Sequence, residues 1–138
     1  MSNFRSVIGA IVALGVLWST PSYSAEVLTA GSSWVNELGS VLTITNVDGN
    51  GLMTGTYVTN VGRSAGTPQQ MTGFFYPGAS SGGAITFSVY FQNCLSVTSW
   101  SGQYDSTDGS FQTLWYLTSA SPPVWNGIAA GTDMFTPQ

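Results

Sequence analysis

Short runs of β-branched and aromatic residues, separated by Gly, Asn, Asp and Pro, fill the chain after residue 25. No long window shows the 3.6-residue apolar period of an amphipathic helix, so the pattern predicts strands. The pairs Asp48-Gly49 and Asp108-Gly109 favour hairpin turns, because such turns need a positive φ. Short strands at regular spacing indicate an all-β protein, either an eight-stranded antiparallel up-and-down barrel or a sandwich. We expect the strands near residues 32–38, 40–46, 52–60, 69–76, 84–92, 95–104, 110–119 and 127–136.

Alternate residues of a strand face opposite sides, so the parity of a position predicts which side chains point inward. Most inner faces are largely apolar, as in the run Ile85, Phe87, Val89 and Phe91. Several also carry a polar group, namely Asn36, Ser40, Tyr57, Thr59, Thr98 and Asp133. Buried polar groups normally have hydrogen-bond partners, because an unpaired one is costly. The residues alone leave two alternatives: these groups satisfy one another and the backbone, or they bind a small ligand inside a barrel.

The first part of the chain has a different pattern. Arg5 precedes an apolar run over residues 7–17, and Pro21 and small residues follow it. This order is typical of a secretory signal, which we predict over residues 1–24, leaving one domain over residues 25–138. The apolar run is short for a membrane span, although an N-terminal membrane anchor is the alternative. We therefore expect a secreted protein, extracellular or periplasmic, that has no membrane partner.

Composition excludes several classes of function. The chain has 138 residues, which suits one domain, with two basic and six acidic side chains and no histidine. A net charge of −4 leaves no basic surface for phosphates, so we expect no nucleic-acid partner. The lack of histidine removes His-dependent triads, and a single cysteine excludes an internal disulfide and Cys-rich zinc sites. Because no His or Lys is available to activate a serine, the sequence predicts neither an enzyme nor a metal site.

Five stretches of the sequence resemble the avidin/streptavidin family. They read WVNELGS, TGTYVT, TSWSGQY, LWYLTS and GTDMFT, at residues 34–40, 54–59, 98–104, 114–119 and 131–136. Each stretch is weak evidence alone, but five in unbroken order over eight predicted strands are specific. The resemblance spans the chain from about residue 31 to residue 136. It implies an avidin-like, eight-stranded up-and-down barrel that binds biotin at one open end.

Carried over position by position, the resemblance assigns polar residues to the ureido group of biotin. It implies that Asn36, Ser40 and Tyr57 donate hydrogen bonds to the ureido oxygen. Thr59 and Asp133 would accept hydrogen bonds from the two ureido N–H groups. A carboxylate at this position is a charge-assisted acceptor, which is stronger than a neutral one.

The remaining assignments concern the other parts of the ligand. Thr98 would approach the thioether sulfur, and Ser96 the valerate carboxylate. Trp125 would cap the site of a neighbouring subunit. Three aromatic side chains would form the walls around the apolar ring: Phe91, Trp100 and Trp115. The resemblance thus implies high-affinity, non-catalytic binding, with biotin as the ligand and no cofactor.

Residues in the predicted loops raise further questions. Arg63 follows the third strand, where its guanidinium would pair with the ligand carboxylate or project into water. The connection from Phe91 to Ser96 is short, so we expect little cover over the ligand tail and faster release than in the tightest family members. Its lone thiol, Cys94, would pair between chains or fill a tight turn. Trp125 lies on a proline-stiffened loop and needs cover, so we expect a homotetramer, with a homodimer as the alternative.

Two other non-enzymatic functions stay open at this point. One is a lipocalin-like carrier of small ligands, and the other is a structural or adhesive β-protein whose aromatic interior serves packing alone. A hydrophobic carrier has no use for a polar cluster shaped for a cyclic urea, so the cluster distinguishes these alternatives. Asp105 and Asp108 superficially resemble the carboxylate pair of a glycosidase, but turn chemistry explains both.

Overall fold

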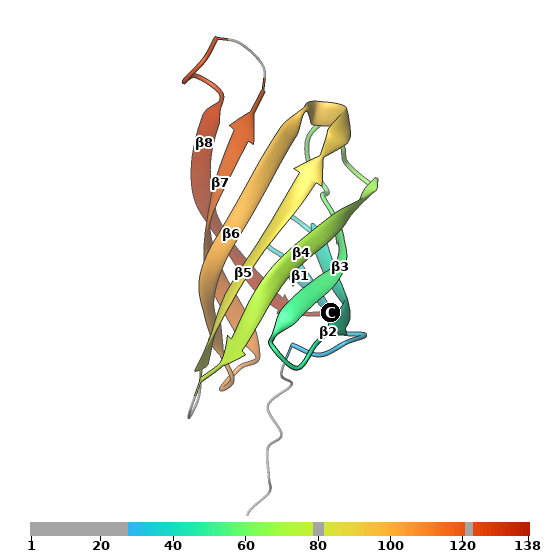
Figure 1. Cartoon of the computed structure of the whole chain (residues 1–138), viewed down its shortest axis with the longest axis vertical. Coiled ribbons are helices and arrows are strands. Elements are labelled where there is room, and N and C mark those ends of the chain that lie inside the picture. Colours follow the sequence, from blue (N-terminus) through green and yellow to red (C-terminus); the bar gives the residue numbers. More distant parts are fainter. Residues whose placement is uncertain (1–27, 79–81, 121–122) are drawn as a thin grey trace, which may run out of the picture.

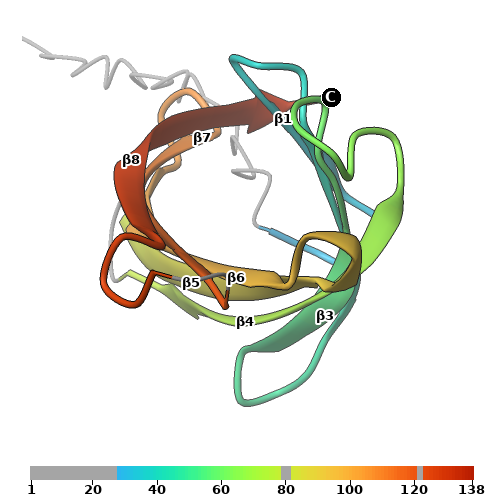
Figure 2. The ribbon, with the colours of Figure 1, turned by 90° about the horizontal axis from the view of Figure 1, so that it is seen from above.

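The protein folds into one closed barrel of eight antiparallel strands, shown in Figure 1. This computed structural model describes residues 28–78, 82–120 and 123–138. Each strand pairs with the next, and the last pairs with the first, so the sheet has closed on itself. Figure 2 shows the resulting ring from above. The up-and-down barrel is confirmed over the alternative of a sandwich. Its strands are β1 (Ser33–Asn36), β2 (Val41–Val47), β3 (Leu52–Val58), β4 (Pro68–Pro77), β5 (Gly82–Phe91), β6 (Ser96–Asp105), β7 (Ser110–Ser119) and β8 (Ile128–Pro137).

The connections alternate between the two ends of the barrel because neighbouring strands run in opposite directions. The β1–β2, β3–β4, β5–β6 and β7–β8 connections lie at one end, which we call the open end. The β2–β3, β4–β5 and β6–β7 connections lie at the other, the closed end. In Figure 1 the β5–β6 and β7–β8 connections stand at the top of the view. Side chains near the open-end connections therefore come together from distant parts of the sequence.

Aromatic side chains fill the interior toward the closed end. Trp34 is 1% exposed and contacts Tyr104 edge-on, with ring centroids 6.1 Å apart. Phe111 stacks on Phe135 at 4.7 Å, and Phe135 meets Phe87 in a T-shaped contact. Such rings bury large apolar areas, which stabilise the barrel. Trp34 is thus a core residue at the closed end and not part of the cavity lining.

The first strand ends earlier than expected, at Asn36 rather than near residue 38. Asn36 Oδ1 accepts hydrogen bonds from the backbone N–H groups of Leu38 at 3.1 Å and Ser40 at 2.8 Å. Gly39 takes a φ of 81° between them. A side chain that bonds to nearby backbone competes with the strand ladder, so the chain turns here.

The two predicted hairpin pairs behave differently. Gly109 has a φ of 71°, so the expectation for Asp108-Gly109 is confirmed. The hairpin expected at Asp48-Gly49 is present between β2 and β3, but its positive φ, 81°, lies at Gly51 and not at Gly49. Asp48 Oδ1 accepts hydrogen bonds from the backbone N–H groups of residues 50 and 52. The connection is therefore two residues longer than a two-residue hairpin turn, and the position that needs a glycine is residue 51 instead of residue 49.

The predicted secretory signal lies outside the described residues and stays a prediction. Within the described ranges, no helix has the length and hydrophobicity needed to cross a membrane.

Candidate ligand-binding site

A cavity of about 390 Å³ opens at the open end of the barrel. This volume lies within the usual range for small-molecule sites. Strands β1, β3, β5, β6, β7 and β8 and the turn after β1 all contribute side chains to its lining. Ten of the eleven residues that the resemblance assigns to a ligand line this one cavity: Asn36, Ser40, Tyr57, Thr59, Phe91, Ser96, Thr98, Trp100, Trp115 and Asp133.

Hydrogen-bond donors gather on the β1–β3 side of the cavity. The side-chain oxygen of Asn36, Oδ1, accepts hydrogen bonds from two backbone N–H groups. Its Nδ2 amide group has no partner among the described residues. Ser40 Oγ accepts a hydrogen bond from the Asn60 backbone N–H at 3.0 Å and also bonds with the Tyr57 hydroxyl. Because the acceptor capacity of Asn36 and Ser40 is largely used, what these side chains offer to a ligand is donors.

Tyr57 keeps its proton at any ordinary pH. Burial raises the pKa of this hydroxyl from 10.0 to about 12. The hydrogen bond with Ser40 lowers the pKa, while the negative charges of Asp133 and Glu37 raise it further. The phenol therefore remains a donor and does not ionise in the cavity.

Acceptors also line the cavity, on β8 and directly after β3. Asp133 is 6% exposed, and its Oδ2 accepts a hydrogen bond from Trp100 Nε1 at 2.7 Å. The second carboxylate oxygen, Oδ1, has no partner in the described part of the chain. Thr59 Oγ1 donates its proton to the carbonyl of Val61 at 3.1 Å, so it can offer a ligand only a lone pair. A buried carboxylate with a free oxygen strongly favours a ligand that brings an N–H donor.

A hydroxyl in the cavity is fully buried and yet has no partner. Thr98 Oγ1 is the single fully buried side-chain oxygen or nitrogen without a hydrogen bond among the described residues. An unsatisfied buried hydroxyl is costly, so such groups in folded proteins need an explanation. Because Thr98 lines the cavity, a bound ligand atom would supply the missing contact.

Aromatic rings form the walls and are held in place before any ligand arrives. Trp100 stacks on Phe87 with centroids 4.7 Å apart and an interplanar angle of 10°, and it also packs against Tyr57 at 5.0 Å. Trp115 lies opposite Gly131 on β8. A Cβ at Gly131 would lie 2.4 Å from Trp115 Cζ2, so the indole needs a glycine there.

Comparison with known proteins assigns this barrel to a family. Residues 24–138 match the Avidin family. The chain belongs to that family. Avidin-related protein 4/5 of Gallus gallus is 30% identical over 144 residues, which cover 99% of this chain and 95% of that protein. The resemblance found in the sequence is thus confirmed.

Solved structures of avidin-family proteins share the fold. Core-bradavidin is 44% identical, with a TM-score of 0.71, covering 78% of this chain and 98% of that chain. A shwanavidin variant in complex with biotin is 32% identical, with a TM-score of 0.70, covering 83% of this chain and 100% of that chain.

This avidin-family cavity also includes residues that the sequence did not single out as ligand contacts. The additional lining residues are Leu38, Val61, Gly62, Ser64, Cys94, Leu117 and Ser119. Arg63, for whose guanidinium the sequence left two alternatives, lines the cavity as well. Leu117 lies two residues from Trp115 on the same strand and therefore shares its inner face, so parity could have found it. Most of the others lie in connections, where no periodic pattern marks the direction of a side chain.

The lone thiol joins two connections at the cavity mouth. Cys94 belongs to a short 3₁₀ turn, Gln92–Cys94, between β5 and β6, and its Sγ lies 3.0 Å from Ser64 Oγ in the β3–β4 connection. The thiol therefore has a hydrogen-bond partner within the chain and fills a turn. No group of three His, Cys, Asp or Glu side chains in the described ranges could hold a metal ion.

Trp125 is the assigned residue that does not line the cavity of its own chain. Its side chain is 83% exposed on the β7–β8 connection, and its backbone φ is 74°. A role in a neighbouring subunit stays a prediction.

Proposed function

We propose that this protein binds biotin, without catalysing any reaction, in the cavity at the open end of its barrel. The observation that carries this proposal is the set of polar atoms left over after the protein has made its own hydrogen bonds. Donors remain at Asn36 and at the Ser40–Tyr57 pair, and acceptors remain at Thr59 and Asp133. A cyclic urea offers one oxygen acceptor and two N–H donors, which is the complementary set.

The bonds to the urea reinforce one another. Donors from Asn36, Ser40 and Tyr57 converge on the ureido oxygen and draw negative charge onto it, which makes the two N–H groups better donors. The Asp133 carboxylate then accepts one of them as a charge-assisted bond in a largely dry site. This arrangement favours a urea over a ligand that offers only apolar surface.

Contacts to the rest of biotin follow the same logic. Thr98, whose hydroxyl lacks a protein partner, approaches the thioether sulfur, and Ser96 lies toward the valerate carboxylate. The walls of Phe91, Trp100 and Trp115 enclose the apolar ring. Because the stacked Trp100 does not have to become ordered on binding, little entropy is lost, and this supports high affinity.

Calorimetry with free biotin and with lipoic acid tests the proposal. Lipoic acid carries a sulfur ring and a pentanoate tail but no urea, so it probes the apolar walls without the polar cluster. We expect strong binding of biotin, quenched Trp fluorescence, and no measurable binding of lipoic acid. Equal affinity for both ligands would favour a lipocalin-like carrier, and folded protein that binds neither would overturn the proposal.

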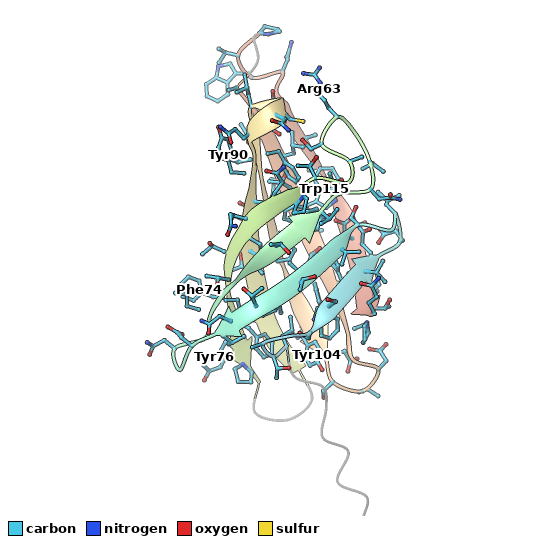
Figure 3. The ribbon with its side chains drawn as sticks, turned by 90° about the vertical axis from the view of Figure 1, so that its right-hand side faces the viewer. Arg63, Phe74, Tyr76, Tyr90, Tyr104 and Trp115 are labelled. Carbon is cyan, nitrogen blue, oxygen red and sulfur yellow. The ribbon has the colours of Figure 1, made fainter. Side chains whose placement is uncertain are left out.

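We further propose that the barrel forms a homotetramer, with a homodimer as the alternative. Large apolar side chains are exposed on the outside of β4–β8, and Figure 3 shows Phe74, Tyr76 and Tyr90 projecting outward. Leu114 and Tyr116 are similarly exposed on β7. Contiguous exposed apolar surface is typical of an interface, and a second copy of the chain would cover it.

In this assembly Trp125 of one subunit would cap the cavity of its neighbour. Light scattering on the purified protein measures the mass, and Trp125→Ala measures the cap. We expect a tetramer, and faster biotin release from the variant. A monomer whose release rate is unchanged by the substitution would remove Trp125 from the site.

We also propose that the chain is secreted after removal of a signal over residues 1–24. N-terminal sequencing of the exported protein tests this, with a mature chain expected to begin at residue 25 or 26. An intact N-terminus in the membrane fraction would favour the anchor.

A further inference from the structure

Charge is distributed unevenly along the barrel axis. Three of the acidic side chains lie at closed-end turns: Asp48, Asp105 and Asp108. Glu37, near the open end, accepts a hydrogen bond from the Met134 backbone N–H, which ties it to β8. The described part of the chain contains a single basic side chain, Arg63, and it lies at the cavity mouth.

Arg63 is free to meet a ligand. It belongs to the β3–β4 connection, its side chain is exposed, and it forms no ion pair with any described residue. Figure 3 shows its side chain projecting at the open end, above Trp115. The guanidinium therefore lies at the rim of the cavity.

Arg63 differs from the nearby hydroxyl groups, which are buried or already engaged within the protein. Ser64, its neighbour in sequence, is buried and engaged with Cys94. Ser96 lies deeper and is 6% exposed. Ser96 and Arg63 line the same cavity. The planar fork of N–H donors of Arg63 fits a carboxylate on a ligand tail that reaches the mouth.

We propose that Arg63 determines specificity at the tail of the ligand, so that the site prefers a free carboxylate to an amide or ester. This inference rests on the proposed binding of biotin. The carboxylates of Asp133 in the cavity and Glu37 near the open end repel an anionic tail, and a cation at the mouth offsets that repulsion. Biotin joined to another molecule through an amide has lost this charge, so it gains nothing from Arg63.

The effect is modest because the guanidinium is exposed. Exposed ion pairs change an equilibrium constant by about two- to fivefold, and salt screens them. We expect the ratio of affinities, biotin over neutral biotinamide, to fall by about two- to fivefold in Arg63→Gln at low ionic strength. At about 1 M salt the variant and the unmodified protein should give the same ratio.

A charge change elsewhere provides the matched control. Asn50→Asp alters the net charge by the same single unit as Arg63→Gln, but at an exposed closed-end turn. The two ligands are titrated into all three proteins by calorimetry or by competition, at low and high salt. We expect Asn50→Asp to leave the affinity ratio unchanged, which would show that the position of the cation matters.

The outcomes separate this inference from the proposal on which it rests. If biotinamide and biotin both bind, and Arg63→Gln leaves their ratio unchanged, the biotin site stands and the role of Arg63 is overturned. That role is overturned as well if Asn50→Asp lowers the ratio as much as Arg63→Gln does. If neither ligand binds the folded, unmodified protein, the proposal of biotin binding itself fails.

Discussion

Trp100 donates the hydrogen of its indole Nε1 to Asp133 Oδ2 at 2.7 Å. This bond joins β6 to β8 over the inner face of β7 and fixes the carboxylate, while Oδ1 stays available. The indole is also a wall of the cavity, stacked on Phe87. The wall and the anionic acceptor are therefore one unit, and neither can move without the other.

Removing the carboxylate tests this unit. We expect Asp133→Ala to weaken biotin binding by about ten- to a hundredfold, because a charge-assisted hydrogen bond contributes about 1.5–3 kcal/mol. Retention on immobilised biotin and calorimetric titration both measure the loss. Asp108→Ala is the control, since Asp108 bonds Ser110 at the closed end and should not affect binding. An equal loss in the two variants would contradict the site.

Gly131 tests whether the position of Trp115 matters. Because a Cβ at Gly131 would lie 2.4 Å from the indole, Gly131→Ala should push Trp115 out of place. We expect about tenfold weaker binding and an altered Trp emission spectrum in the free protein. Gly49→Ala is the matched control, as a Cβ there meets nothing within 4 Å. Unchanged binding in Gly131→Ala would show that the wall is not needed.

The raised pKa of Tyr57 predicts a specific loss of stability in alkali. Its pKa is about 12 in the folded protein and 10.0 in the unfolded chain. Below pH 10 both states hold the proton, and stability is at its full value. As the pH rises from 10 to about 12, only the unfolded state ionises, so the free energy of unfolding falls by up to about 3 kcal/mol.

Denaturant titrations of the unmodified protein and Tyr57→Phe across this pH interval measure the effect. The variant should show a flatter decline, because it lacks the ionising group. Parallel curves would mean that the hydroxyl ionises as easily inside the barrel as outside it.

The contact between Ser64 and Cys94 allows a reversible disulfide to be introduced at the mouth of the cavity. Their side-chain Oγ and Sγ atoms are 3.0 Å apart, so Ser64→Cys places two thiols close enough to oxidise to a disulfide with little movement. With the β3–β4 connection tied to the 3₁₀ turn, we expect slower biotin release under oxidising conditions. Reductant should restore the original rate in the variant and leave the unmodified protein unchanged. A release rate insensitive to oxidation would show that these connections do not gate the cavity.

Sequence parity located the interior well because the two-residue period of a strand is strict. Tyr57, Thr98 and Asp133 were all placed on inner faces, and all three line the cavity. What parity could not supply is which side chains meet: the bond from Trp100 to Asp133 joins β6 to β8, which do not pair with each other but lie on either side of β7. The resemblance to the Avidin family brought those distant positions together.

The connections were harder to predict for a different reason. Asn36 ends its own strand by binding backbone N–H groups, and Asp48 shifts the glycine of its turn to Gly51. Both effects come from local side-chain hydrogen bonds that compete with regular structure. Arg63 and Cys94 lie in similar segments, so the contact of Cys94 with Ser64 left no trace in the hydrophobic pattern.

The first and last strands lie side by side, and the described chain begins and ends at the closed end of the barrel. The Gln138 backbone N–H donates to the Ser33 carbonyl, and Trp34 pairs with Pro137, so the described chain starts and finishes far from the entrance. A solid support or a fused cargo attached through the C-terminus would thus lie at the end of the barrel away from the mouth.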